Sequence, residues 1–427
     1  MIALAVLVLF LIFIAAGMPV FIAMGISALA GNFAVNGTEM LLTNMALDTY
    51  SSIDSFVLIS VPMYIFSGAL LEATGLSRKL FDFAGMICSG IRGGMGVATV
   101  ISCAIFAAIS GSSVATAATI GLVALPVMAK HGYAKSSTGA LVAAGGTLGI
   151  LIPPSIPLII FGLMTDQSIG ALFVAGVVPG ITLAIIMALY TALTSKVEKT
   201  GVTYTWPQRI RILREAFFVL SLPVMVFIGI YTGIATASEV AALAVFYILV
   251  VGLATHTLSI SKLTQASLGT LRSTAMIFVL VAFGAMMTSL FTTSGIPQTM
   301  VLTIGKSGLP PLVIFTLMVV LYVILGMFLE ALSMMVVTVP ILYPVAMALG
   351  MPPLAFGIFV VLAVEAAQIT PPVGINLFTI AKIGEVPFSE ISRAIIPYVC
   401  LLILMMYLVY FVPSIATWLP STMNYGK

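Results

Sequence analysis

Two pairs of adjacent prolines interrupt hydrophobic segments of this chain, and these interruptions limit its possible folds more than any other feature. Pro153-Pro154 lies within residues 145–157, and Pro371-Pro372 lies within residues 368–376. Each proline removes a backbone donor and clashes with the preceding helical turn, so a helix must break there. In hydrocarbon, a broken helix persists only where protein, water or an ion satisfies the freed backbone groups. A matched pair of such segments predicts a transporter binding site.

The composition places these segments in a membrane. Of the 427 residues, 61% are hydrophobic and 7% are charged, which leaves too few polar residues to cover a soluble core. No polar stretch is long enough for a soluble domain, and no nucleic-acid partner is expected. Three cysteines without a CxxC pair and two histidines predict no disulfide framework and no metal centre of these residues. Residues 1–16 lack a preceding basic region, so we expect a membrane helix rather than a cleaved signal peptide.

We therefore expect an all-α polytopic membrane protein with about ten full spans and two re-entrant helical hairpins. The hairpins are predicted at residues 96–129 and 311–348, where Ser110-Gly-Ser-Ser113 and Glu330-Ala-Leu-Ser333 form polar breaks. Limbs of about 14 residues in the first hairpin are shorter than the roughly 20 needed to span a bilayer. The two broken helices are predicted at residues 136–164 and 354–383.

Basic residues orient these elements through the positive-inside rule. The segment 196–215 is the most basic, with Lys196, Lys199, Arg209, Arg211 and Arg214, and is predicted to be a cytoplasmic loop. The first hairpin then opens to the cytoplasm and the second to the outside. Both chain termini are predicted to lie outside.

The two halves of the chain repeat at a nearly constant spacing. Pro126 precedes Pro153 by 27 residues, and Pro344 precedes Pro371 by 27. Gly132 and Gly350 share the offset of 218 residues that relates these prolines. Because the hairpins are predicted to open on opposite sides, the sequence indicates an inverted-topology repeat.

These features together resemble the large membrane subunit of the tripartite ATP-independent periplasmic (TRAP) transporters, over essentially the whole chain. The resemblance implies the fold of the wider ion-transporter superfamily, with scaffold and elevator-type transport domains. It implies a separate small four-helix membrane subunit, a periplasmic substrate-binding protein, and sodium-driven import of an organic acid, with sialic acid favoured from overall likeness. Two or more Na⁺ ions and no covalent cofactor are expected, in the bacterial inner membrane.

The expected division of the chain follows from this resemblance and from the repeat. The two scaffold parts are residues 1–55, which end in an interfacial amphipathic segment, and residues 216–273, which end in a polar arm. The transport elements are residues 56–195 and 274–427, the latter including the last span. The basic loop 196–215 connects the halves.

Two sodium sites are predicted, because Na⁺ prefers oxygen ligands and both broken helices offer free carbonyls beside hydroxyl side chains. The first comprises Ser110, Gly111, Ser112, Gly145, Thr147, Gly149, Ile150 and Pro153. The second comprises Gly326, Glu330, Ser333, Thr370, Pro372 and Gly374. Small polar residues at these positions could instead satisfy backbone groups within the helix bundle.

A carboxylate substrate is predicted to bind where four half-helix N-termini converge, because free amides and the helix dipole favour an anion there. No Arg or Lys lies in a hairpin limb or beside either break. The candidate contacts are Ser112, Ser113, Pro154, Ser155, Ser333 and Asn376. For Asn376, a structural bond between helices is an equal alternative.

Glu330 and Glu365 are the ionisable residues expected deepest in the membrane, where a carboxylate is a functional hypothesis. Either could bind a cation or carry a proton, so proton coupling is an alternative to sodium coupling. For Glu365, a position near an interface or a bond to a hydroxyl is the structural alternative.

Other functional classes fit the sequence less well. An enzyme is not expected, because the chain has no HExxH motif and its two histidines fall in loops. The chain also has no GxxxxGK[ST] phosphate loop, so it is not expected to be an ATP-driven pump. A channel is the stronger rival, because re-entrant loops also build selectivity filters.

Overall fold

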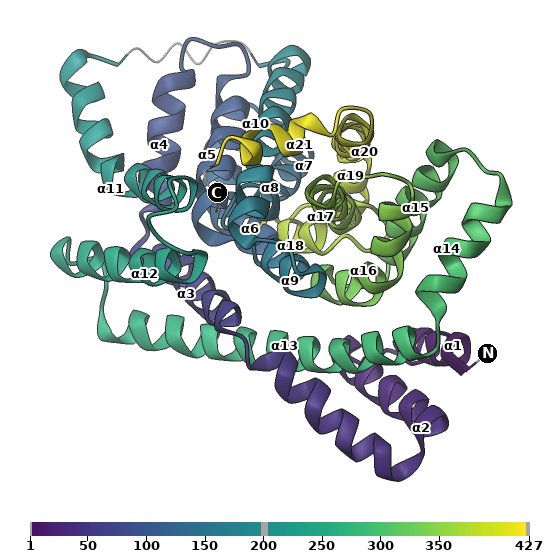
Figure 1. The fold of residues 1–427 in the computed structure, drawn as a ribbon. Coiled ribbons are helices and arrows are strands. Elements are labelled where there is room, and N and C mark those ends of the chain that lie inside the picture. The colour runs from purple at the N-terminus through teal and green to yellow at the C-terminus, as the bar shows by residue number, and fades with distance from the viewer. Residues whose placement is uncertain (1, 198–203, 424–427) are drawn as a thin grey trace.

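The computed structural model describes residues 2–197 and 204–423, and within those residues it consists of helices and connecting turns without a strand. A helix satisfies its own backbone donors and acceptors, which is why so apolar a chain forms helices in a membrane. In Figure 1 the long helix α13 (Ile260–Thr293) runs between α1 and α2 on one side and a compact cluster of helices on the other. The predicted all-α class is confirmed.

Among residues 2–197, the structure forms ten α-helices and one short 3₁₀ helix. In order they are α1 (Ile2–Ala15), α2 (Val20–Ile53), η1 (Phe56–Ile59), α3 (Ser60–Thr74), α4 (Ser77–Cys88), α5 (Gly94–Ser110), α6 (Ser113–Lys130), α7 (Lys135–Gly146), α8 (Leu148–Leu151), α9 (Ile156–Thr165) and α10 (Ile169–Thr194).

The second half begins with α11 and follows a similar order from α13 onward. Its elements are α11 (Trp206–Tyr231), α12 (Ala237–Ala254), α13, α14 (Ile296–Ser307), α15 (Pro311–Leu325), α16 (Ala331–Ala348), α17 (Pro353–Ile369), α18 (Ile375–Gly384), α19 (Phe388–Ala394), α20 (Ile396–Phe411) and α21 (Ser414–Ser421).

Corresponding helices of the two halves start at a constant spacing. α6 starts at Ser113 and α16 at Ala331, 218 residues later, and the starts of α7 and α17 differ by the same number. The limbs α5 and α6 of the first hairpin pack against each other, whereas in the second pair, α15 and α16, α16 packs on α13 and α14; each pair is followed by a helix broken at Pro-Pro. The opposite orientation of the two halves stays a prediction.

Two expected connections are helical instead. The span predicted from residue 216 begins at Trp206, because Thr205 and Gln208 form a capping box in which the Thr205 amide donates to Gln208 Oε1 at 2.9 Å. Arg209, Arg211 and Arg214 are therefore on α11, while Lys199 lies outside the described residues. The arm predicted before residue 274 is continuous with the following span as α13. No proline interrupts residues 260–293, so nothing ends the helix there.

Three further boundaries differ from expectation. The second hairpin reverses at residues 326–330 rather than 330–333, because the Glu330 side chain caps the start of α16. The segment expected at the interface from residue 38 continues α2 past a kink at Gly37, where φ is +70°. The limbs α5 and α6 have 17 and 18 residues, more than the 14 expected.

The number of full spans is less well defined than the number of helices. Within the described residues, eight helices are long and apolar enough to cross a membrane, or nine if α19 and α20 are one span bent by 43°. These eight include α6 and α16, because an 18-residue helix is about 27 Å long and approaches the thickness of the hydrocarbon core. Helix length alone therefore does not confirm the expected ten spans.

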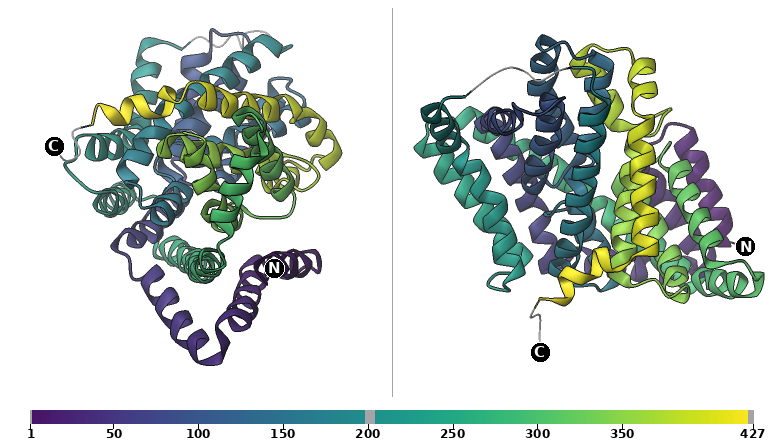
Figure 2. Two further views of the ribbon diagram at one scale, coloured as in Figure 1. Left: turned by 45° about the vertical axis from the view of Figure 1, so that its right-hand side comes forward. Right: turned by 90° about the horizontal axis from the view of Figure 1, so that it is seen from above.

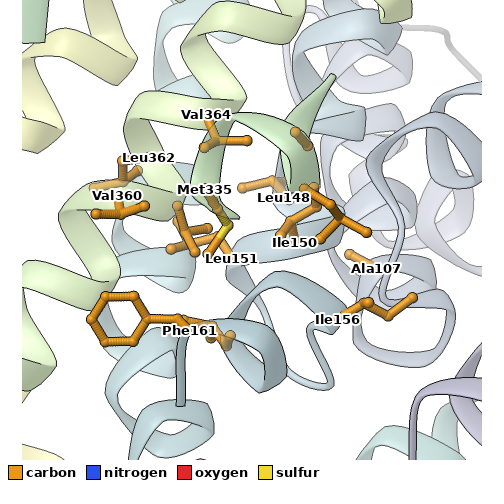
Figure 3. Packing of buried hydrophobic residues seen from close by; sticks show 14 of the residues in the cluster. Ala107, Leu148, Ile150, Leu151, Ile156, Phe161, Met335, Val360, Leu362 and Val364 are labelled. Carbon is orange, nitrogen blue, oxygen red and sulfur yellow. The ribbon is translucent and has the colours of Figure 1, made fainter. Parts of the chain in front are cut away.

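The broken helices and hairpins share one apolar core. Every residue of α17 from Ala355 to Ile369 is buried. Figure 3 shows Val360, Leu362 and Val364 of α17 with Leu148, Ile150 and Leu151 of α8, Met335 of α16 and Ala107 of α5. This packing holds the hairpins and the helix breaks in fixed positions relative to one another.

Candidate functional site

The tip of the first hairpin lies against the first helix break. The backbone of Gly111 has φ +61°, and a Cβ there would lie 2.9 Å from the Pro154 carbonyl oxygen. A Cβ on Gly149 would lie 2.7 Å from the Ser112 carbonyl oxygen. Real Cβ atoms do not approach this closely, so glycine allows the hairpin tip and the broken helix to touch.

Hydroxyl groups cap the helix starts at this junction. Ser112 Oγ accepts from the Ala115 amide at 3.4 Å at the start of α6, and Ser155 Oγ accepts from the Leu158 amide at 3.3 Å at the start of α9. Ser110 Oγ lies 2.8 Å from Thr116 Oγ1, which donates to the Ser112 carbonyl at 2.8 Å. The first tip is therefore dense in oxygen atoms.

The residues predicted for the first sodium site are only partly together. Ser110, Gly111 and Ser112 lie at the tip, beside Gly149 and the break at residues 152–155. A Cβ on Gly145 would instead meet Cys103 Sγ at 2.7 Å, so Gly145 packs against the limb α5 rather than the tip. The Thr147 hydroxyl donates to the Ala144 carbonyl at 2.6 Å.

The second hairpin tip has a carboxylate where the first has Ser112. Glu330 caps α16, since its Oε1 accepts from the Leu332 amide at 3.3 Å and its Oε2 from Ser333 Oγ at 3.1 Å. Gly326 packs against Ala367 of α17, and the Thr370 hydroxyl donates to the Ala366 carbonyl at 2.6 Å. The hydroxyls of Ser333 and Thr370 donate their protons to other protein atoms, and the lone pairs of their oxygen atoms can still ligate a cation.

A buried junction joins the first hairpin to the second broken helix. Ser113 Oγ donates to Glu365 Oε2 at 2.9 Å and accepts from Asn376 Nδ2 at 2.7 Å. Glu365 and Asn376 have no exposed surface, and Ser113 is 1% exposed. Three elements from opposite halves, α6, α17 and α18, thus meet at one serine hydroxyl.

A cavity of about 420 Å³ lies between both hairpin tips, both broken helices and the helices α3 and α13. Its lining includes Ser110, Gly111, Ser112, Ser113, Ile150 and Glu330 from the predicted sites. It also includes Gln368, Glu72, Thr270 and Ser273, which were not predicted as site residues. Gln368 could have been found, because it is a polar side chain in the last turn before the second break.

Four predicted substrate contacts do not line this cavity. Ser155, Ser333 and Asn376 are buried and already bonded to the Leu158 amide, Glu330 and Ser113, respectively. Pro154 is also absent from the lining and lies against Gly111. Ser112 and Ser113 do line the cavity, so of the six predicted contacts these two face the space directly.

The charge of the cavity is unusual for an anion site. Glu72 and Glu330 line it and no Lys or Arg does. The donors available to a carboxylate are hydroxyls, helix-start amides and the Gln368 amide. Among the described residues, no group of three His, Cys, Asp or Glu side chains could hold a metal ion. The oxygen atoms that the two tips offer to a sodium ion are hydroxyls, backbone carbonyls and the Glu330 carboxylate.

Residues 7–415 match a family described as the tripartite ATP-independent periplasmic transporter, DctM component. The chain belongs to this family. Members are large membrane subunits of TRAP transporters, so the resemblance seen in the twin Pro-Pro breaks is confirmed, and the chain is a multi-pass membrane protein.

Several characterised TRAP subunits are similar to this one over nearly all of the chain. The C4-dicarboxylate large permease protein of Pseudomonas aeruginosa is 33% identical over 88% of this chain and 89% of its own length. The sialic acid large permease protein of Vibrio cholerae is 31% identical over 96% and 97%. The isethionate permease protein DctMQ of Oleidesulfovibrio alaskensis is 34% identical over 95% of this chain, which spans 64% of that longer protein.

Solved structures with low sequence identity share the fold. The YdaH transporter of Alcanivorax borkumensis superposes with a TM-score of 0.62 at 15% identity, covering 88% of this chain and 89% of that one. MtrF of Neisseria gonorrhoeae gives 0.63 at 12% identity, covering 89% and 85%. At this identity the likeness establishes a transporter-type fold for the TRAP subunit and nothing about its substrate.

Proposed function

We propose that this TRAP subunit imports an organic acid together with sodium, in the bacterial inner membrane. Its proposed partners are a separate small four-helix membrane subunit and a periplasmic substrate-binding protein that delivers the acid. The observation that carries this proposal is the cavity of about 420 Å³ at which both hairpin tips and both broken helices meet. Membership of the DctM family supports the partners.

The proposed transport mechanism is an elevator movement of the hairpins and broken helices relative to the scaffold parts, residues 1–55 and 216–273. Besides the tips and breaks, the cavity is lined by Glu72 of α3, and by Thr270 and Ser273 of α13 at the end of the expected scaffold part. Basic residues follow or flank these positions, Arg78 on α4 and Arg272 on α13, and the positive-inside rule assigns them to the cytoplasm. The conformation is therefore inferred to be open inward.

The substrate is proposed only at the level of a small organic acid. Relatives of 30–34% identity are named for isethionate, C4-dicarboxylates, sialic acid and ectoine. Sialic acid, favoured from the sequence, has no more support than the others. Because no Lys or Arg lines the cavity, the proposal assigns the substrate carboxylate to amides, hydroxyls and nearby sodium.

A proton-coupled carrier of the same fold is the second candidate. The buried carboxyl of Glu365 favours it, because a buried acid in a membrane protein often relays protons. Imposing a sodium gradient or a proton gradient separately distinguishes the two forms of coupling.

The test is uptake by proteoliposomes that contain this subunit with its small subunit and its binding protein, using a substrate found by screening that binding protein. We expect saturable uptake with an inward sodium gradient and at least a tenfold loss with choline or with Ser112→Leu, which fills the tip with an apolar side chain. Ser421→Leu, exposed at the end of α21, is the matched control and should transport normally. Uptake driven by a proton gradient alone, or normal uptake by a folded Ser112→Leu protein, would contradict this proposal.

A further inference from the structure

The junction at Ser113 contains two buried oxygen atoms without a partner. Glu365 Oε1 and Asn376 Oδ1 have no hydrogen bond, although the other polar atom of each side chain is bonded to Ser113 Oγ. Both side chains are fully buried. A buried polar atom without a partner is costly and rare, so this pair needs an explanation.

Counting hydrogen-bond donors and acceptors shows that this junction lacks one donor. An ionised carboxylate and an amide oxygen both only accept hydrogen bonds, so the two unpaired atoms cannot satisfy each other. The single hydroxyl proton of Ser113 is already given to Glu365 Oε2. One additional proton on Glu365 Oε1 would turn one of the two acceptors into a donor.

No cationic side chain compensates a charge on Glu365. The helices in contact with α17 carry the titratable residues Tyr190, Tyr322, Tyr343, Lys382, Tyr398, Cys400, Tyr407 and Tyr410, and Glu330, Asp166 and Glu385 cap three of them. Within the described part of the chain, none of these has a hydrogen bond or ion pair to Glu365. Tyr322 bonds Thr338, Tyr398 bonds Thr191, Tyr407 bonds Thr316, and Lys382 is exposed.

We infer that Glu365 is a proton-binding site, whose carboxylic acid proton holds the first hairpin tip to the second broken helix through Asn376 and Ser113. A dehydrated sodium ion would satisfy the same oxygens, but none of the five cavities described has Glu365 or Asn376 in its lining. A proton needs no such space. This inference concerns the core of the proposed carrier but requires neither a substrate nor sodium coupling.

The decisive measurement is the infrared spectrum of the purified subunit in detergent, in H₂O and D₂O. We expect a carbonyl band of a protonated carboxylic acid that disappears in Glu365→Gln and persists in Glu390→Gln, which removes an exposed carboxylate on α19. The Glu365→Gln amide has the shape of the acid and, like the acid, offers both a hydrogen-bond donor and an acceptor. Its melting temperature should therefore stay within about 2 °C of wild type. Glu365→Ala should melt several degrees lower, because it leaves Ser113 without its acceptor.

Melting temperatures measured against pH test the same inference where the carboxylic acid band overlaps other infrared bands. Raising the pH should lower the melting temperature of the wild type and leave that of Glu365→Gln less affected, because only the acid can lose a proton. If no protonated band depends on Glu365, the inference is wrong. A sodium-dependent rise in melting temperature that Glu365→Gln abolishes, while the band is absent, would show that the site takes sodium instead of a proton.

Discussion

Adjacent residues at the first hairpin tip serve different purposes. Ser112 caps α6 from its N-terminal side, while Ser113 is the first helical residue and turns inward to Glu365 and Asn376. Ser112 has the extended backbone of an N-cap whereas Ser113 is helical, so the two side chains leave the chain in different directions and reach different partners. On α17, Glu365 and Gln368 are three residues apart and share one face. Glu365 lies at the closed junction and Gln368 at the cavity.

Gln368 is predicted to bind the substrate. Its Nε2 atom is buried and without a partner, yet its side chain lines the cavity. A hydrogen bond to a charged group contributes about 1.5–3 kcal/mol, so Gln368→Leu should raise the Michaelis constant for uptake by roughly 10- to 100-fold. Gln368→Glu should be worse, because it adds a third carboxylate to the cavity. Gln298→Glu on the exposed face of α14 is the control, and equal effects of both Glu variants would refute the role of Gln368.

At the scale of elements, the short helix α8 positions the first break. It contains only Leu148 to Leu151, all buried, between the last turn of α7 and the Pro-Pro pair. Its backbone touches the tip of the first hairpin because Gly149 has no side chain. The tip and the break are therefore one rigid unit assembled from two segments.

Adding a methyl group at Gly149 should push the tip of the first hairpin away from the first helix break. A Cβ would lie 2.7 Å from the Ser112 carbonyl and 2.8 Å from Thr116 Oγ1, neither of which is a flexible side-chain end. Overpacking of this kind typically costs about 1–3 kcal/mol, so Gly149→Ala should melt lower and lose sodium-driven uptake. Gly305→Ala on α14 meets nothing within 4 Å and should be neutral or slightly stabilising. A Gly149→Ala protein as stable and active as the Gly305→Ala protein would contradict this packing.

At the scale of the whole molecule, two polar cavities are lined by different parts of α13. The candidate site is lined by Ser273, while a second cavity of about 570 Å³ is lined by Thr288, Asp48 and Asp166. Ser273 and Thr288 are 15 residues apart on one helix, about 22 Å along its axis. In the right-hand view of Figure 2, α11 begins at the top and α21 lies at the bottom, so the two ends of the bundle can be followed. In the proposed orientation Arg272 assigns the Ser273 end of α13 to the cytoplasmic side, so we expect the two cavities to open toward opposite membrane faces.

This arrangement predicts that reagents reach the two ends of α13 from opposite sides of the membrane. In a Cys400→Ser background, Ser273→Cys should react with a membrane-impermeant maleimide in inside-out vesicles, and Thr288→Cys in right-side-out cells. The buried Cys88 and Cys103 should remain unlabelled. Labelling of Ser273→Cys from the outside would place the candidate cavity on the periplasmic side and would contradict the inward-open assignment.

The sequence by itself determined the elements: helix breaks at Pro-Pro, the first hairpin reversal at Gly111, spans such as α10 and the family. These follow from local chemistry, because prolines, glycines and long apolar runs act on the segment that contains them. It misplaced the second hairpin turn, because α15 ends before its C-cap Gly326, which packs against Ala367, and α16 begins only after its cap Glu330.

Only the tertiary structure decided which side chains share a site. Ser113, Glu365 and Asn376 are more than 250 residues apart on the chain at their extremes, and no sequence spacing relates them. The structure likewise placed Gln368, Thr270 and Ser273 in the cavity and removed Ser155, Ser333 and Asn376 from it. The physical reason is that polar side chains, which must form hydrogen bonds, and apolar side chains, which must pack, occupy the same protein interior. Which hydroxyl remains free for a ligand depends on neighbours brought together from both halves.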